Sequence, residues 1–146
     1  MMFKDLAHEQ FYEGNVIRAH RQHDPYRKAL FYLLGLTEDT RRNINDLYNF
    51  KEDSIRLEGL NESWQTGTTS RLTRLAFNLY TGYTGESEED ARHYSPYYLF
   101  DNGLLPYFFE AVKLRYPSYA SDLSQSWTSF QPFTNHGRDV WDELEH

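Results

Sequence analysis

The side chains best suited to chemistry lie in a polar stretch without helical or strand periodicity that ends at Trp64. Three carboxylates, Glu52, Asp53 and Glu58, fall within it. Paired carboxylates can carry out acid–base chemistry or hold Mg²⁺, but neighbours in sequence need not face one cleft. The alternative is that these carboxylates form ion pairs with Arg41, Arg42, Arg71 or Arg74.

A second group of candidates begins the strongest helical pattern, at the sequence Gly-Thr-Thr-Ser-Arg. Free backbone N–H groups at a helix N-terminus favour an anion, and Arg71 and Arg74 would add positive charge. The full phosphate-loop pattern is absent, because no Lys precedes a Ser or Thr after spaced glycines. Ordinary helix capping by Thr68, Thr69 or Ser70 is the alternative.

The two groups are close enough in sequence to meet. We expect Trp64 to fold back over the helix start, with Arg71 and Arg74 on neighbouring turns of that helix. The sequence therefore predicts one cluster, which is either a polar clasp that fixes the loop or a site for an anion or a partner. The candidate binding residues are Glu52, Asp53, Glu58, Trp64, Thr68, Thr69, Ser70, Arg71 and Arg74.

Metal, cofactor and catalytic signals are weak. His20, His23 and Asp24 crowd together, but Pro25 restarts the helix there and no fourth ligand is placed by spacing. Cysteine is absent, which excludes thiol catalysis and thiolate zinc sites. The zinc-protease, serine-hydrolase and dinucleotide motifs are also missing. We therefore expect no metal and no cofactor, assign no catalytic residue, and favour a protein that is not an enzyme.

Charge and aromatic content point toward protein partners. The formal net charge is −7; residues 1–73 carry ten basic and eleven acidic side chains, and residues 74–146 carry five and eleven. An acidic net charge argues against nucleic-acid binding. DNA binding through Arg18, Arg21, Arg27 and Lys28 is therefore the weakest hypothesis. Nine aromatic residues between positions 94 and 119 exceed what short helices can bury. They favour a protein-contact patch or a homodimer seam.

The fold class predicted is all-α, a compact irregular assembly of about five helices with an ordered aromatic tail over residues 118–143. Helical patterns cover about residues 4–21, 25–35, 37–48, 68–82 and 106–115, with a brief helical segment over 95–100. Asp24 before Pro25 and Ser95 before Pro96 are expected helix starts. The helix over 68–82 should bury the face formed by Leu72, Leu75, Ala76 and Leu79 and should end at Gly82. Residues 50–67 lack a period and are expected to be a long connection or a set of short turns.

Residues 1–143 are expected to form a single domain, and residues 144–146 look like a purification-tag remnant. No apolar run of about 18 residues and no signal peptide is visible, so we expect a cytoplasmic protein.

Several strings resemble a family of small proteins of unknown function from Gram-positive gut bacteria, often carried on conjugative elements or phages. They are EDTRRNINDL with FKED, then EGLN, WQT and TRLAFNL, and later PYFFEA and LRYP. The resemblance spans about residues 26–119 and carries over no activity or functional residue. It implies an accessory gene on mobile DNA, and such genes often encode proteins that block host defences or regulate transfer.

Together these observations favour a non-enzymatic accessory protein that acts by protein–protein interaction, with inhibition of a host defence system as one such role. The alternative is a small enzyme or sensor that binds a phosphorylated or other anionic ligand at the Thr68 helix start.

Overall fold

The computed structural model of the chain describes residues 1–120, so the expected aromatic tail lies outside the described residues from position 121 on. Within residues 1–120 there are eight α-helices, two 3₁₀ helices and one pair of two-residue strands. The prediction of a mainly helical fold is confirmed. The expected number of about five helices is too low, because the expected helix over 37–48 is broken in two and the segment over 88–99 forms two short α-helices.

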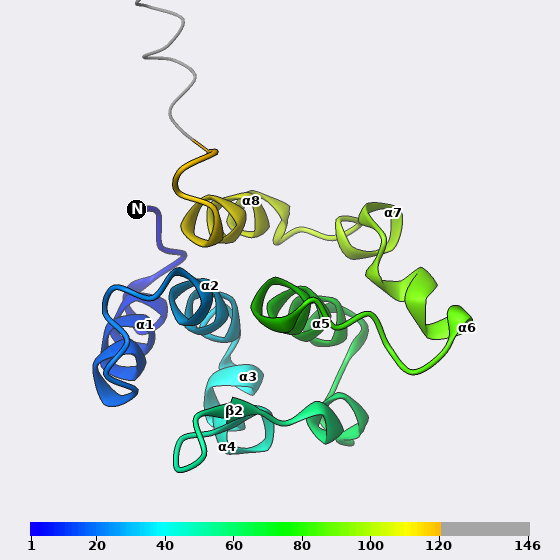
Figure 1. The fold of residues 1–146 in the computed structure, drawn as a ribbon, viewed down its shortest axis with the longest axis horizontal. Coiled ribbons are helices and arrows are strands. Elements are labelled where there is room, and N and C mark those ends of the chain that lie inside the picture. The colour runs from blue at the N-terminus through cyan, green and yellow to red at the C-terminus, as the bar shows by residue number, and fades with distance from the viewer. Residues whose placement is uncertain (121–146) are drawn as a thin grey trace, which may run out of the picture.

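Helix α2 (Pro25–Leu34) is the centre of the fold. Figure 1 shows it between α1 (Leu6–Arg18) and α5 (Gly67–Thr81), with α8 (Leu105–Arg115) lying across the same group. Residues 29–34 are all fully buried. A helix that is apolar on every side must be covered on every side, and α1, α5 and α8 provide that cover. As expected, Asp24 caps this helix and Pro25 occupies its first turn.

Helix α1 is shorter than the predicted 4–21. Asp5 accepts a hydrogen bond from the His8 backbone N–H and so starts the helix. At the other end His20 adopts a left-handed φ of 56°, which stops helical propagation. His8 is fully buried; its Nδ1 lies 3.0 Å from the Lys4 backbone nitrogen and its Nε2 lies 2.7 Å from the Tyr32 carbonyl oxygen. This neutral imidazole joins the chain start to α2, and burial lowers its pKa.

The expected helix over 37–48 is interrupted at Asn43. Helix α3 (Glu38–Arg42) ends there and α4 (Ile44–Leu47) begins, because the Asn43 side chain donates to the Asp39 carbonyl oxygen, a local bond that competes with the helix. The antiparallel strands β1 (Tyr48–Asn49) and β2 (Ser54–Ile55) follow, with Tyr48 opposite Ile55.

The 3₁₀ helix η1 (Leu57–Asn61) then packs against α4. Gly59 makes this close approach possible: a Cβ there would lie 2.4 Å from the Asp46 carbonyl oxygen. The segment after residue 50, expected to be a long connection or a set of short turns, is therefore a hairpin and a 3₁₀ turn.

Helix α5 begins one residue before the predicted caps. Thr66 is the N-cap, and its side chain and that of Thr69 each accept a bond from the other residue's backbone N–H. Thr68, Thr69 and Ser70 therefore lie inside the first turn. The predicted buried face of Leu72, Leu75, Ala76 and Leu79 is confirmed. Gly82, with a φ of 80°, ends the helix as expected.

The chain then forms one end of the molecule from three short elements. They are α6 (Glu88–Ala91), the 3₁₀ helix η2 (Arg92–Tyr94) and α7 (Pro96–Leu99), which Figure 1 places beside α5 and away from α1. Ser95 caps α7 as predicted. Helix α8 returns to the centre, where Phe108 and Ala111 are fully buried. None of the helices within residues 1–120 is both long and apolar enough to cross a membrane.

Candidate functional site

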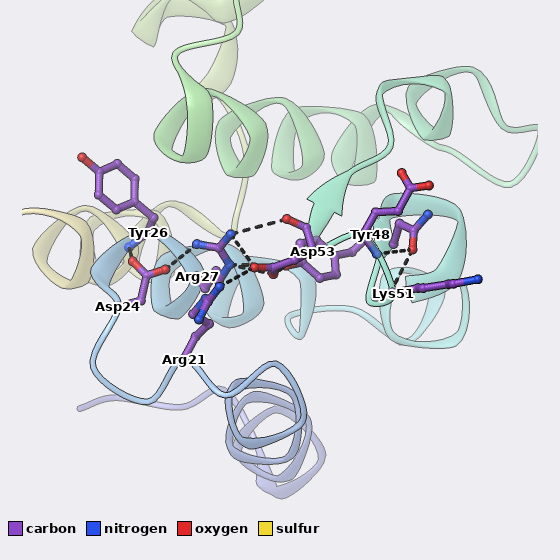
Figure 2. Close-up of polar contacts among 9 residues, drawn as sticks. Arg21, Asp24, Tyr26, Arg27, Tyr48, Lys51 and Asp53 are labelled. Carbon is purple, nitrogen blue, oxygen red and sulfur yellow. Dashed lines mark hydrogen bonds and ion pairs between the residues drawn. The ribbon is translucent and has the colours of Figure 1, made fainter.

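Asp53 is the centre of a dense polar cluster between the hairpin and α2. Figure 2 shows Arg21, Arg27 and Tyr48 converging on its carboxylate. Arg27 donates from Nε and Nη2 at 2.9 and 3.0 Å, Arg21 donates from Nη2 at 2.6 Å, and the Tyr48 hydroxyl donates as well. Asp24 accepts a further bond from Arg27 at 2.5 Å. Every charged group of this cluster has a partner of opposite charge, which is the pattern of a structural clasp.

The electrostatics of Asp53 agree with that interpretation. Burial disfavours its charged form, but the hydrogen bonds from Tyr48, Arg27 and Arg21 outweigh burial and lower its pKa. Its φ of 56° lies in the left-handed region, which turns the carboxylate toward α2. Since Arg21 and Arg27 point inward to this carboxylate, they are poorly available to a DNA backbone.

The structure does not bring the nine predicted site residues into one cluster. Asp53 faces α2 instead of α5, and Glu52 is exposed on the hairpin. Trp64 donates from its indole N–H to Asp46 at 3.0 Å, which fixes the ring against α4. The cause is the hairpin, which turns the chain at Asp53 toward the earlier helix. The expected clasp with Arg71 and Arg74 is therefore not formed within residues 1–120. Asp53 pairs instead with Arg27 of α2 and with Arg21 of the loop before it.

Two of the hydroxyls at the start of α5, those of Thr66 and Thr69, are occupied by local bonds. Thr69 donates to the Gln65 side-chain oxygen at 2.7 Å and accepts from the Thr66 backbone N–H at 2.7 Å. Thr68 is exposed and Ser70 is partly buried. Helix capping therefore explains the role of the Thr69 hydroxyl without a bound anion.

The arginines of α5 rest on an aromatic ring. The Arg71 guanidinium lies 4.1 Å from the Tyr98 ring centroid, and its Nε donates to the Tyr98 carbonyl oxygen at 2.8 Å. Arg74 lies 5.6 Å from the same ring and donates from Nη1 to the Tyr98 hydroxyl at 3.3 Å. Within residues 1–120, neither guanidinium forms an ion pair with a carboxylate within 4.0 Å.

Arg74 lines a cleft of about 280 Å³ between η1, α5 and the segment that leads through α6 to η2. Glu58 faces the same cleft from η1, so the structure unites two of the predicted residues there. Sequence reasoning missed the other polar lining groups, Asn61, Tyr83, Glu86, Asp90 and Tyr94. The signal that could have found them is Gly85, which has a φ of 93° and permits the turn between the helix end and the acidic segment.

Both tyrosines of the cleft stay protonated at neutral pH. Burial and a 2.8 Å hydrogen bond to Glu86 raise the pKa of Tyr83 to about 12. Burial also raises the pKa of Tyr94, although Arg74 opposes the shift. The two rings pack edge to face, with centroids 5.8 Å apart and planes at 85°. Phenols in this state donate hydrogen bonds and do not serve as general bases.

A shallower hollow of about 520 Å³ lies on the neighbouring surface, lined by Arg92, His93, Ser95, Tyr97 and Tyr98. Tyr97 is 94% exposed, the largest fraction among the exposed large apolar side chains of the described chain. We call this hollow and its five lining residues the Tyr97 surface. Tyr98 belongs to it and also contacts Arg74, so the hollow and the cleft are neighbours.

No metal centre is apparent in the part of the chain that the structure describes, where no three His, Asp or Glu side chains are grouped to hold an ion. His20, His23 and Asp24 lie at the junction of α1 and α2, and Asp24 is bound to Arg27.

Comparison with known proteins gives one match. The sequence model of a family of unknown function (DUF6075) matches residues 1–127 of the chain. No curated protein and no solved structure matches it.

Proposed function

The chain belongs to this family of unknown function, and we propose that it acts as a non-enzymatic protein that binds a partner protein through the Tyr97 surface. The observation that carries the proposal is Tyr97 itself, a ring that is 94% exposed beside a hollow lined by Arg92, His93 and Tyr98. Tyr and Arg are the residue types most enriched where binding energy concentrates in protein interfaces.

Local contacts fix the backbone around the Tyr97 surface. Ser95 caps the short helix α7 through a hydrogen bond from the Tyr98 backbone N–H, and Pro96 fixes the first turn. The guanidinium of Arg71 packs against the ring of Tyr98. A pre-ordered surface loses little conformational entropy on binding, which favours affinity. An exposed ring on a fixed helix start therefore suits a contact with a partner better than a purely structural role does.

The biological setting is part of the same proposal. The resemblance of residues 26–119 to proteins of conjugative elements and phages supports an accessory role on mobile DNA in the bacterial cytoplasm. There the partner would be a component of a host defence system. Expression of the wild-type protein in a host with an active defence system should then raise the plating of a restricted phage, and the Tyr97→Ala protein should not.

The direct test is co-purification from the host with three tagged proteins: wild type, Tyr97→Ala and Tyr119→Ala. Tyr119 is a matched control, because it is 88% exposed but lies beyond α8. A discrete partner should be recovered in near-stoichiometric amount with wild type and Tyr119→Ala and should be lost with Tyr97→Ala. The proposal fails if no recovered protein depends on Tyr97.

A second candidate function is a sensor for an anionic ligand at Arg71 and Arg74. It is favoured by the lack of any carboxylate partner for these guanidinium groups within residues 1–120, since an arginine without a counter-ion can take one from a ligand. Stabilisation of the folded protein by inorganic phosphate or acetate, lost in Arg74→Gln, would support this candidate.

A further inference from the structure

The Arg74 cleft keeps groups of opposite charge apart. Its lining includes one guanidinium and three carboxylates, Glu58, Glu86 and Asp90. None of these carboxylates lies within 4.0 Å of Arg74. Arg74 instead donates to a phenol, Tyr98. Opposite charges that share a cleft usually close into an ion pair unless packing holds them apart, so this arrangement is complementary to a molecule that carries both charges.

The hydrogen bonds that the cleft carboxylates and Arg74 already make leave some of their acceptor and donor positions unused. Glu86 accepts from Tyr83 through one oxygen, and Asp90 accepts from the Glu86 backbone N–H through one oxygen. Glu58 lies 3.9 Å from Arg56, at the limit of an ion pair, and its side chain is 70% exposed. A carboxylate accepts up to about four hydrogen bonds and a guanidinium donates up to five. Both the acidic side and Arg74 can therefore bind further groups.

We propose that this cleft binds a small zwitterion, a molecule with a carboxylate and an ammonium group close together, of which a free α-amino acid is the simplest example. Arg74, the one cationic side chain among the lining residues within 1–120, takes the ligand carboxylate. Glu58 and Asp90 take the ammonium group, with the rings of Tyr83 and Tyr94 beside it as a cation–π wall. The proposal is independent of the Tyr97 surface and restricts the second candidate function to ligands with both charges.

The dimensions of the cleft agree with this ligand class. Pockets for drug-sized ligands span about 300–1,000 Å³, so a cleft of about 280 Å³ matches a smaller molecule. Most of its lining is polar or charged, which disfavours an apolar ligand. The protonated Tyr94 hydroxyl adds a donor on the wall of the same space.

Calorimetric titration and thermal unfolding with the twenty common amino acids test the proposal directly. At least one amino acid should bind and raise the melting temperature of the wild-type protein. Its N-acetyl derivative lacks the ammonium charge and its amide lacks the carboxylate, so each should bind at least tenfold more weakly. A dipeptide of the same residue separates the two charges and distinguishes a free amino acid from a peptide source.

Substitutions within the cleft complete the test. Arg74→Gln and Glu58→Gln should each weaken binding about tenfold or more, the loss of one charged hydrogen bond. Glu89→Gln should not, because Glu89 is exposed outside the cleft lining. Glu58 is exposed enough that its substitution leaves the fold intact, so folding failure of Arg74→Gln would not prevent a decision. The proposal is overturned if no amino acid binds, or if the N-acetyl derivative binds as well as the free amino acid. The latter result would favour a simple anion site, and neither result bears on Tyr97-dependent protein capture.

Discussion

Arginines on two neighbouring helices of this molecule have their charges satisfied in different ways. Arg27 on α2 is surrounded by the carboxylates of Asp24 and Asp53 and by the Tyr48 hydroxyl. Arg74 on α5 has the ring and hydroxyl of Tyr98 and faces an open cleft. Both side chains are half-buried, yet within residues 1–120 only Arg27 has a carboxylate within 4.0 Å.

This difference distinguishes an arginine whose charge stabilises the fold from an arginine whose charge is available to a ligand. Removing one partner of a partly buried ion pair leaves the other charge poorly compensated, so such a pair is costly to break. A guanidinium stacked on a partly exposed ring, as Arg74 is on Tyr98, contributes only about 1 kcal/mol. We therefore expect the α2 arginine to matter for folding and the α5 arginine to matter for binding.

The largest effect is expected from Arg27→Gln. The substitution leaves Asp24 and Asp53 without their shared cation, and the side chains of these two residues are 19% and 30% exposed. We expect a loss of roughly 3 kcal/mol in the free energy of unfolding, at the low end for buried pairs because Arg21 and Tyr48 still contact Asp53. Urea unfolding measures this loss of free energy. A loss no larger than that of Arg74→Gln would contradict the division into a structural arginine on α2 and a binding arginine on α5.

The next effect concerns pH and the Asp53→Asn protein, which should be about 2 kcal/mol less stable than wild type at pH 7. The pKa of Asp53 is lowered in the folded state, so its stabilisation is present above the ordinary carboxyl pKa of 3.8 and is lost as pH falls below it. The stability difference between the two proteins should therefore shrink below about pH 4.

Other groups cancel in this comparison. His8 has a lowered pKa, so both proteins should lose stability alike as pH falls below its unfolded pKa of about 6.5. Thermal unfolding at several pH values checks the prediction. A difference that stayed constant down to pH 2 would mean that the Asp53 charge does not contribute.

A smaller loss is expected from Tyr98→Leu, which removes the ring beneath Arg71 and Arg74. The lost stacking and hydroxyl bond should cost about 1 kcal/mol. Tyr97→Leu is the matched control, since Tyr97 is 94% exposed and should change stability by less than about 0.5 kcal/mol. Chemical unfolding of the two proteins side by side decides the matter, and equal losses would show that Tyr98 does not hold the arginines in place.

The smallest effect is expected from Arg74→Gln without ligand. No carboxylate of residues 1–120 lies within 4.0 Å of Arg74 and loses a partner, so the free energy of unfolding should fall by about 0.5 kcal/mol or less. A loss near that of Arg27→Gln would identify Arg74 as a structural residue and would weaken the distinction drawn between α2 and α5.

The features that the sequence predicts well are those that adjacent residues determine. Asp24 before Pro25 and Ser95 before Pro96 are local start signals, and both begin helices. The spacing of the apolar residues in α5 also identifies its buried face. Thr66 was missed as a cap because three consecutive hydroxyl residues after it offered competing starts, and the reciprocal bond with Thr69 depends on geometry.

The features that could not be predicted depend on contacts between distant positions. Arg27 and Asp53 meet across 26 residues through a hairpin whose strands are two residues each, too short for any alternation to reveal them. Glu58 shares a cleft with Tyr83 only because η1 and the segment after α5 lie on one side of that helix. The nine candidate residues are close in sequence, and closeness in sequence is a weak guide to the direction in which a turn sends the chain.

The central position of α2 has a consequence for how the protein is made. Its apolar surface emerges early in synthesis, but Phe108 and Ala111, which cover one side, lie about 80 residues further along. Until the ribosome has released α8, residues 29–34 have no complete cover. Nascent chains truncated before that helix should therefore bind chaperones or aggregate, whereas chains that include it should fold.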